Sequence, residues 1–290
     1  MLIDNLSLGV VVGLAALIIA SISDLKTREV PDWLNFSLSF FAIGYAVILS
    51  IFHWNASFIV NSAAGLLFGL GIGLLMFYTG QWGGGDSKLI IGLSAILGLS
   101  VPYISDLKGD YELLIFLANT LFVGAVYGLA FSAWKAVVHF SECKAEAIFK
   151  LKQKSVRVAK IVLLIFMIIS LVNYMLSPGL DSAFLVGISI VMMAMLYMWI
   201  LISCVEKVHM IRKIKVSGLT EGDWVVETVM KGGKTILKPN KTGVTTEDIG
   251  LLKKNKIQEV TIKVGIPFVP SFLIAYILMM IIGNWLVYLF

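Results

Sequence analysis

The sequence predicts an all-α polytopic membrane protein with about eight transmembrane helices and a small α+β cytoplasmic insertion. Of its 290 residues, 59% are hydrophobic and only 14% are charged, and the mean hydropathy is +0.93. A soluble fold cannot hide that much apolar surface from water. The hydrophobic residues form runs close to the length of a membrane span, and the basic residues gather in a subset of the loops between them.

Eight hydrophobic segments are visible, and most approach the roughly 20 residues that cross a bilayer as a helix. They cover residues 6–23, 34–52, 57–79, 86–104, 112–135, 158–177, 182–204 and 265–289. The fourth is the weakest, because Gly92, Gly98 and Pro102 interrupt it. Taken alone, this segment fits either a short span or a re-entrant element.

The placement of basic residues favours eight full spans. If the N-terminus faces outward, every Lys and Arg except Lys108 falls in a loop on the cytoplasmic side. Because positively charged loops remain inside, this asymmetry predicts a multi-pass protein of the cell membrane with both termini outside. A re-entrant fourth segment would instead turn the later, lysine-rich loops outward.

The spans and loops divide the chain into five predicted parts. These are a transmembrane core at 1–138, a basic cytoplasmic segment at 139–157, an additional helix pair at 158–205, a small soluble cytoplasmic domain at 206–263 and a last transmembrane helix at 264–290. The basic segment alternates charged and apolar residues. It fits a helix lying on the anionic inner leaflet and, equally well, a positively charged tether.

The 206–263 domain shows signals of both strand and helix. They are a strand at 223–229, a turn at 231–234, a returning strand at 235–237, a helix ending near residue 256 and a last strand at 258–263. Thr245, with Asp248 three positions later, fits a capping box that starts the helix. A unit of fewer than about 60 residues is marginally stable alone, so we expect it to pack on the membrane domain.

Two acids, Asp24 and Asp86, lie at the predicted cytoplasmic mouths of apolar helices. A carboxylate at a membrane boundary is costly and marks a candidate functional site. Two carboxylates at one level can share a proton and activate water, which is the chemistry of aspartic proteases. Each acid alone also fits a structural role. Asp24 could end a helix beside Lys26 and Arg28, and Asp86 could be the N-cap of the helix that follows it.

Three consecutive glycines precede Asp86. A helix cap needs one flexible residue, so the run favours a cleft that admits an extended substrate backbone. The substrate-binding candidates are therefore Gly83, Gly84, Gly85 and Lys88. A phosphate cradle is the competing interpretation, but the chain lacks the GxxxxGK[ST] pattern. Lys88, like the basic residues near Asp24, could tune the acid pair or bind lipid headgroups.

Other polar and small residues are interpreted as structural. Gly65, Gly69 and Gly73 recur at every fourth position, which is typical of a close helix-packing face. Asp32, after Pro31, is expected to cap the second helix. Asparagines in or near the spans are expected to form interhelical hydrogen bonds; they are Asn61, Asn119, Asn173 and Asn284.

No cofactor, metal site or disulfide is predicted. The three histidines, at 53, 139 and 209, fall on different loops, and the two cysteines, at 143 and 204, form no CxxC pair. The net charge of +5 is not taken as a sign of nucleic-acid binding, because the location of the charge matters more than its sum. The expected partners are therefore a protein substrate and membrane lipids, with no nucleic acid.

Together, the two acidic motifs resemble those of type IV prepilin peptidases. Asp24 stands in Asp-x-Lys-x-x-x-Val-Pro-Asp, and Asp86 stands in Gly-Gly-Gly-Asp-Ser-Lys. The second motif is similar to the GxGD signature of a class of membrane aspartyl proteases. The motifs lie about 60 residues apart, with two predicted spans between them. The resemblance covers roughly residues 8–135, and Gly265-Ile266-Pro267-Phe268-Val269-Pro270 is similar to the archaeal prepilin and preflagellin (prearchaellin) peptidases.

This resemblance implies a membrane-embedded aspartic endopeptidase with Asp24 and Asp86 as its catalytic pair. Such an enzyme removes the short basic leader of pilin or archaellin precursors at the cytoplasmic face. One aspartate, ionised, would take a proton from water, while the other, protonated, would polarise the carbonyl and protonate the leaving amine. The two roles are not assigned from the sequence, because a close pair titrates as a unit.

The chain also departs from the family pattern. It has no cysteine-rich methyltransferase segment, so N-methylation is not implied. The helix pair at 158–205 and the domain at 206–263 are additions to the smaller archaeal enzymes, and they leave substrate choice open. For the domain we expect regulation or a structural lid more than leader binding, because it is rich in lysine and the leader is basic.

Three rival functions remain. A presenilin-like protease would cut its substrate within the transmembrane helix, but the two acids lie at the membrane boundary. An ion- or proton-coupled transporter would favour a midplane site and internal repeats, and no convincing repeat is visible. A non-catalytic scaffold for the 206–263 domain leaves the two acids and the glycine run unexplained.

Overall fold

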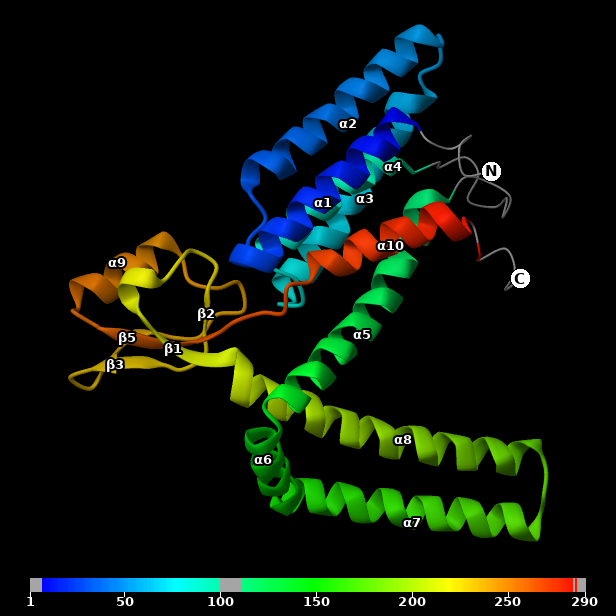
Figure 1. Ribbon diagram of the computed structural model, residues 1–290, viewed down its shortest axis with the longest axis vertical. Helices are drawn as coiled ribbons and strands as arrows, with labels where there is room; N and C mark the ends of the chain where they lie inside the picture. The colour runs from blue at the N-terminus through cyan, green and yellow to red at the C-terminus, as the bar shows by residue number, and fades with distance from the viewer. Residues whose placement is uncertain (1–6, 100–110, 284, 286–290) are drawn as a thin grey trace. The chain divides into compact units, whose positions relative to one another are not determined.

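Helices make up most of this chain, and a small sheet region interrupts them (Figure 1). The computed structural model describes residues 7–99, 111–283 and 285. The chain divides into two compact units: residues 1–128 with 213–290, and residues 129–212. The five predicted parts do not follow this division, and their boundaries stay predictions.

The helices of the first unit come from both ends of the chain. They are α1 (Leu8–Thr27), α2 (Asp32–Phe52), α3 (Ser57–Tyr78), α4 (Gly84–Leu97), the first part of α5 (Glu112–Val138) and α10 (Val269–Ile282). In Figure 1, α10 (red) runs alongside α1 (blue), although the two helices stand at opposite ends of the sequence. The first and last helical segments therefore share one hydrophobic core.

Six described helices are long and apolar enough to cross a membrane: α1, α2, α3, α5, α7 and α8. This confirms a helical, polytopic membrane protein. The other two predicted spans correspond to α4 and α10, which have 14 residues each in the described part of the chain. α4 ends where Gly98 turns the backbone into a left-handed conformation (φ 69°), and residues 100–104 of that predicted span lie outside the described residues. The count of eight spans stays a prediction.

A stripe of glycines lets α3 and α4 pack backbone to backbone. A Cβ added at Gly65 would lie 2.2 Å from the carbonyl oxygen of Ser94, and one at Gly69 would lie 2.5 Å from the Ser94 side chain. At Gly73 the same atom would be 2.9 Å from the backbone of Ser87. Small residues allow such an approach between apolar helices. The predicted packing face is confirmed, and it holds α4, the helix that carries Asp86.

Polar contacts fix α10 against its neighbours. The hydroxyl of Tyr276, which is fully buried, donates to the carbonyl oxygen of Val10 at 3.2 Å. The side chain of Asn119 on α5 donates to the carbonyl oxygen of Ala275 at 3.4 Å and accepts from the indole of Trp285 at 2.8 Å. The interhelical role predicted for Asn119 is therefore confirmed. These contacts hold the middle of α10 against the start of α1 and against α5.

The sheet region, which follows α8 and precedes α10 in the sequence, forms a small domain. Its elements are β1 (Ile211–Lys215), a 3₁₀ turn (Val216–Gly218), β2 (Trp224–Val225), β3 (Val229–Lys231), β4 (Lys234–Leu237), α9 (Thr246–Lys254) and β5 (Glu259–Lys263). One sheet has the strand order β1-β5-β2, and β3 and β4 form a separate antiparallel hairpin. Its apolar core is centred on Val225, Leu252 and Ile262.

Most of the predicted elements of this domain are present, with one correction. The hairpin turn at Gly232 and Gly233, both with positive φ, and the last strand are confirmed. Thr245 and Asp248 form the predicted capping box: the Asp248 N–H donates to Thr245 Oγ1 at 3.2 Å, and the Thr245 N–H to Asp248 Oδ2 at 3.0 Å. The single strand predicted at 223–229 is wrong, because β2 pairs with β5 while β3 pairs with β4.

The second unit holds the end of α5, then α6 (Phe140–Lys152), α7 (Lys154–Leu176), α8 (Leu180–Val205) and a π-helical turn (Glu206–Met210). The basic segment is thus helical, with a break where Gln153 is extended. Whether this helical segment lies on the inner leaflet or serves as a positively charged tether stays open. His139 and His209, which the sequence places on different loops, have ring centroids 5.1 Å apart, because the turn after α8 returns to the start of α6. Within the described ranges, no three His, Cys, Asp or Glu residues gather to hold a metal ion.

Candidate active site

Asp24 is a buried carboxylate in the last turn of α1, with 5% of its surface exposed. α1 ends three residues later, at Thr27, because Arg28 adopts a left-handed conformation (φ 63°) and its N–H bonds to the Asp24 carbonyl oxygen at 3.0 Å. The Asp24 side chain is held from another part of the chain. Its Oδ2 accepts the backbone N–H of Val269, the first residue of α10, at 2.9 Å.

Arg28 joins the end of α1 to the segment that precedes α10. Its guanidinium donates to the carbonyl oxygen of Gly265 and also acts electrostatically on Asp24. Of the two roles left open for this arginine, tuning the acid and binding lipid headgroups, the contacts support the first. Two contacts therefore hold the end of α1 against the start of α10. One joins the Arg28 side chain to the Gly265 carbonyl, and the other joins the Asp24 side chain to the Val269 N–H.

Asp86 lies in the first turn of α4, as the third residue of that helix. Its Oδ2 accepts the N–H of Gly83 at 3.3 Å, as the third residue of a capping box does. Gly83 is the N-cap, so the structural role considered for Asp86, that of the N-cap itself, is wrong. The side chain is half-buried and lies within electrostatic reach of Asp24.

The two carboxylates form one electrostatic site. The charge of Asp24 acts on Asp86, although they belong to different helices and the motifs lie far apart in the sequence. Tyr127, a half-buried residue of α5, lies in the field of Asp24 and Arg28 as well. Nothing in the sequence singled out Tyr127, because an aromatic residue within an apolar span is most often part of the packing. Two acids placed in this way can share one proton, and each accepts a hydrogen bond from a backbone N–H, that of Val269 or of Gly83.

A known protein family matches part of this chain. Residues 11–129 match the type IV leader peptidase family. This stretch contains both Asp24 and Asp86, and the match confirms the predicted resemblance to prepilin and preflagellin peptidases. We refer to residues 11–129 as the leader peptidase region.

Curated relatives agree with this match. The chain is 37% identical over 87 residues to a preflagellin peptidase of Methanococcus maripaludis and 39% identical over 87 residues to that of Methanocaldococcus jannaschii; each alignment covers 30% of this chain and 37% of the relative. A preflagellin peptidase of Methanococcus voltae is 32% identical over 103 residues, or 35% of this chain and 44% of the relative. The chain thus spans less than half the length of the curated relatives it matches.

The three glycines of the leader peptidase region have different surroundings. A Cβ at Gly85 would lie 3.1 Å from Val30 Cβ and 3.2 Å from the Val30 backbone nitrogen. Gly85 therefore lets the loop after α1 approach the start of α4. At Gly84 a Cβ would only touch the Phe77 ring at 3.7 Å, and at Gly83 it would meet the Asp86 carboxylate at 3.5 Å. A substrate-binding role for these glycines stays a prediction, and Gly83 and Gly84 have the room for it.

Substitution can separate the two glycine roles. Gly85→Val is expected to lower kcat by about 10²-fold, because the added methyl groups push Val30 and the end of α1 away from α4, and a displacement near 1 Å has that effect. Gly84→Ala, which has room beside Phe77, is expected to raise KM at unchanged kcat if the glycines line a substrate cleft. Steady-state cleavage kinetics of both variants provide the measurement. A normal kcat in Gly85→Val would contradict the packing role.

Lys88 and Asp32 pair with each other across the region. Lys88 Nζ lies 2.6 Å from Asp32 Oδ1, and both side chains are substantially exposed. The expectation that Asp32 caps α2 is wrong: Asp32 is the first residue of α2, Pro31 stands at the N-cap, and no side-chain cap forms there. Its carboxylate turns to Lys88 instead. The candidate role of Lys88 in substrate binding stays a prediction.

An aromatic cluster links the loop before Asp86 to the start of α10. Trp82, 7% exposed, packs against Phe272 at 5.2 Å and Phe268 at 6.4 Å between ring centroids. Phe268 also fills the space over Gly124 on α5, where a Cβ would lie 2.5 Å from the ring. The start of α10 thus contacts Asp24 on α1 and the loop that leads to Asp86. No local sequence pattern predicts this cluster, since it joins residues from three separate segments.

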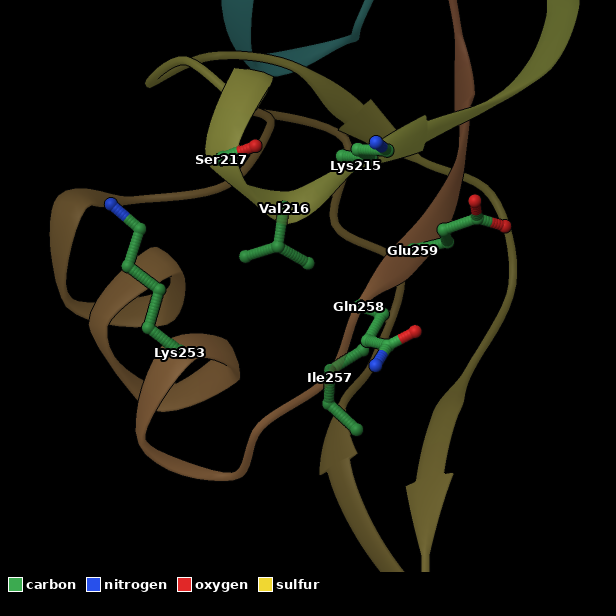
Figure 2. Close-up of a pocket in the computed structure, with 7 residues that line it drawn as sticks. All are labelled: Lys215, Val216, Ser217, Lys253, Ile257, Gln258 and Glu259. Carbon is green, nitrogen blue, oxygen red and sulfur yellow. The ribbon is translucent and has the colours of Figure 1, made fainter.

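A groove of about 540 Å³ lies elsewhere, on the small domain (Figure 2). Lys215, Val216 and Ser217 line it at the end of β1, with Lys253 from α9 and residues 257–259 before and in β5. It contains none of the predicted site residues. The candidate active site therefore consists of the acid pair and its backbone partners, and not of this groove.

Proposed function

We propose that this chain is a membrane-embedded aspartic endopeptidase that removes the short basic leader of type IV prepilin-like precursors, either pilins or archaellins. The observation that carries the proposal is that Asp24 and Asp86, two acids from separate motifs of the leader peptidase region, lie close enough for the charge of one to act on the other. The names of the curated relatives, preflagellin peptidases, support an archaellin-type substrate.

The proposed chemistry requires only the two carboxylates and a water molecule. One aspartate, ionised, takes a proton from water, and the oxygen of that water attacks the scissile carbonyl carbon. The other aspartate, protonated, polarises the carbonyl oxygen and then protonates the leaving amine. Asp24 is buried among α1 and α10, so the amide would react in surroundings from which bulk water is largely excluded.

The site is placed at the cytoplasmic membrane face in this proposal, with both termini outside and the small domain in the cytoplasm. The distribution of basic residues supports that orientation. A precursor could then lie with its apolar helix in the bilayer, which brings the junction between leader and helix to the depth of the acids. Membrane lipids and the precursor are the proposed partners.

A direct test uses the purified protein in detergent. Incubated with prepilin-like and prearchaellin-like precursors, it is expected to produce a loss of mass equal to the leader, with the cut at the junction of leader and apolar helix. A cut within the apolar helix would instead support a presenilin-like activity. No cut in any precursor, together with ion flux into proteoliposomes, would support a transporter.

A further inference from the structure

The start of α10 supplies hydrogen-bond donors to Asp24. The Val269 N–H reaches Asp24 Oδ2 at 2.9 Å across 245 residues of sequence, and the backbone of Phe268 contributes a further hydrogen bond to the same carboxylate. The first N–H groups of a helix have no partner within it and form the positive end of the helix dipole. Both properties favour a negative charge on the group that they contact.

Arg28 adds a cation to the same acid. It acts on Asp24 electrostatically while its guanidinium binds Gly265, just before α10. Two effects oppose these: burial of Asp24 disfavours its charge, and Asp24 lies at the negative end of α1. Burial disfavours the charge of Asp86 as well, and the positive end of α10 offsets the dipole of α1. The short amide bond and the arginine therefore remain as support that favours ionisation of Asp24 over that of Asp86.

Asp86 has weaker support for a negative charge. Its backbone bond, from the Gly83 N–H within its own helix, is 3.3 Å long. Lys88, two residues later, is engaged at 2.6 Å with Asp32. Asp86 also faces the charge of Asp24. Two acids that share a site hold one proton between them, and it resides on the one whose ionised form is less stabilised.

We infer that the start of α10 fixes the two catalytic roles, with Asp24 as the ionised base and Asp86 as the proton donor. The groups that face Asp24 are Arg28 at the end of α1, Asp86 on α4 and Tyr127 on α5, and the described part of α10 contributes its backbone amides. Val269 is thus a positioning residue, which acts through Asp24.

This assignment of roles rests on the proposed function. In one turnover, each proton that is taken up by an aspartate is also released. Asp24 takes a proton from water as the C–O bond forms. Asp86 gives its proton to the nitrogen as the C–N bond breaks, and the electron pair of that bond remains on the amine. The proton held by Asp24 then passes to Asp86 before the next turnover.

A labelling experiment tests which acid is protonated without relying on cleavage. A hydrophobic carbodiimide reacts with protonated carboxyl groups, and mass spectrometry locates the modified residue. In the full-length protein in detergent at neutral pH, Asp86 is expected to be modified and Asp24 to be spared, with Asp24 reacting only at lower pH. Modification of Asp24 before Asp86 would overturn the inference. An inactive protein with the expected labelling order would refute only the peptidase.

Val269→Pro removes the N–H, and Val269→Ala keeps it. Proline fits the first position of a helix, where the N–H has no partner inside the helix. The pH of half-labelling of Asp24 is expected to rise by about one to two units in Val269→Pro and to stay at the wild-type value in Val269→Ala. Equal values in both variants would overturn the inference. A proline at 269 also restricts the backbone of Phe268, so thermal unfolding of both variants checks that the fold is retained. If Val269→Pro does not fold, the labelling order of the wild-type protein still tests the inference.

Discussion

Asp86→Asn is expected to lower the rate of leader removal by about 10²- to 10⁴-fold or more while the protein remains folded in the membrane. An asparagine has nearly the same shape, but it neither carries nor donates the proton that the leaving amine needs, and general acid–base catalysis accounts for that range. Its side-chain oxygen can still accept the Gly83 N–H, so the start of α4 is retained. Asp24→Asn is expected to have the same effect, with the Val269 N–H still bound.

The matched control for both variants is Asp32→Asn. Asp32 belongs to the same sequence motif as Asp24, but its carboxylate is exposed and pairs with Lys88. An exposed ion pair contributes about 0–1 kcal/mol, so cleavage by Asp32→Asn is expected to stay near that of the wild type. Mass spectrometry of the precursor after a fixed time measures all three variants. Substantial activity in both Asp24→Asn and Asp86→Asn would rule out the aspartic mechanism.

The features that the sequence predicted well are those with a local pattern. The glycines of α3 stand out because they repeat with the helix period, and α4 packs on them. The acids stand out because each is a rare charge beside an apolar run, and their catalytic role stays a prediction. Thr245 and Asp248 predicted the start of α9 because a capping box needs only four consecutive residues. In each case the residues that interact, or that share one face, lie within a few turns of the chain.

The features that the sequence did not predict depend on distant partners. Val269 lies 245 residues from Asp24, and its contribution is a backbone amide, which any residue except proline could supply. Asp32 seemed a cap because it follows a proline, and only the position of Lys88 in space shows its partner. β1 was missed because its residues, from Ile211 to Lys215, are mostly basic and exposed and lack an apolar run.

Gly65→Ala is expected to lower the free energy of unfolding by about 1–3 kcal/mol, the usual cost of overpacking a tight interface. The added Cβ would lie 2.2 Å from the carbonyl oxygen of Ser94 and 2.9 Å from Gly98 Cα. Both are backbone atoms, so no side-chain rotation relieves the contact and α4 must move. Because α4 carries Asp86, cleavage is expected to fall together with stability. The midpoint of thermal unfolding in detergent and the cleavage rate are the two measurements.

Gly71→Ala is the matched control on the same helix. A Cβ at Gly71 meets nothing within 4 Å, and alanine favours a helix by up to about 1 kcal/mol over glycine. Gly71→Ala is therefore expected to be neutral or stabilising and to leave cleavage unchanged. If the two alanines had the same effect, the glycines of α3 would serve helix flexibility and not contact with α4. A loss confined to Gly65→Ala, in stability and in rate, would instead show that the close approach of α3 to α4 sets the position of Asp86.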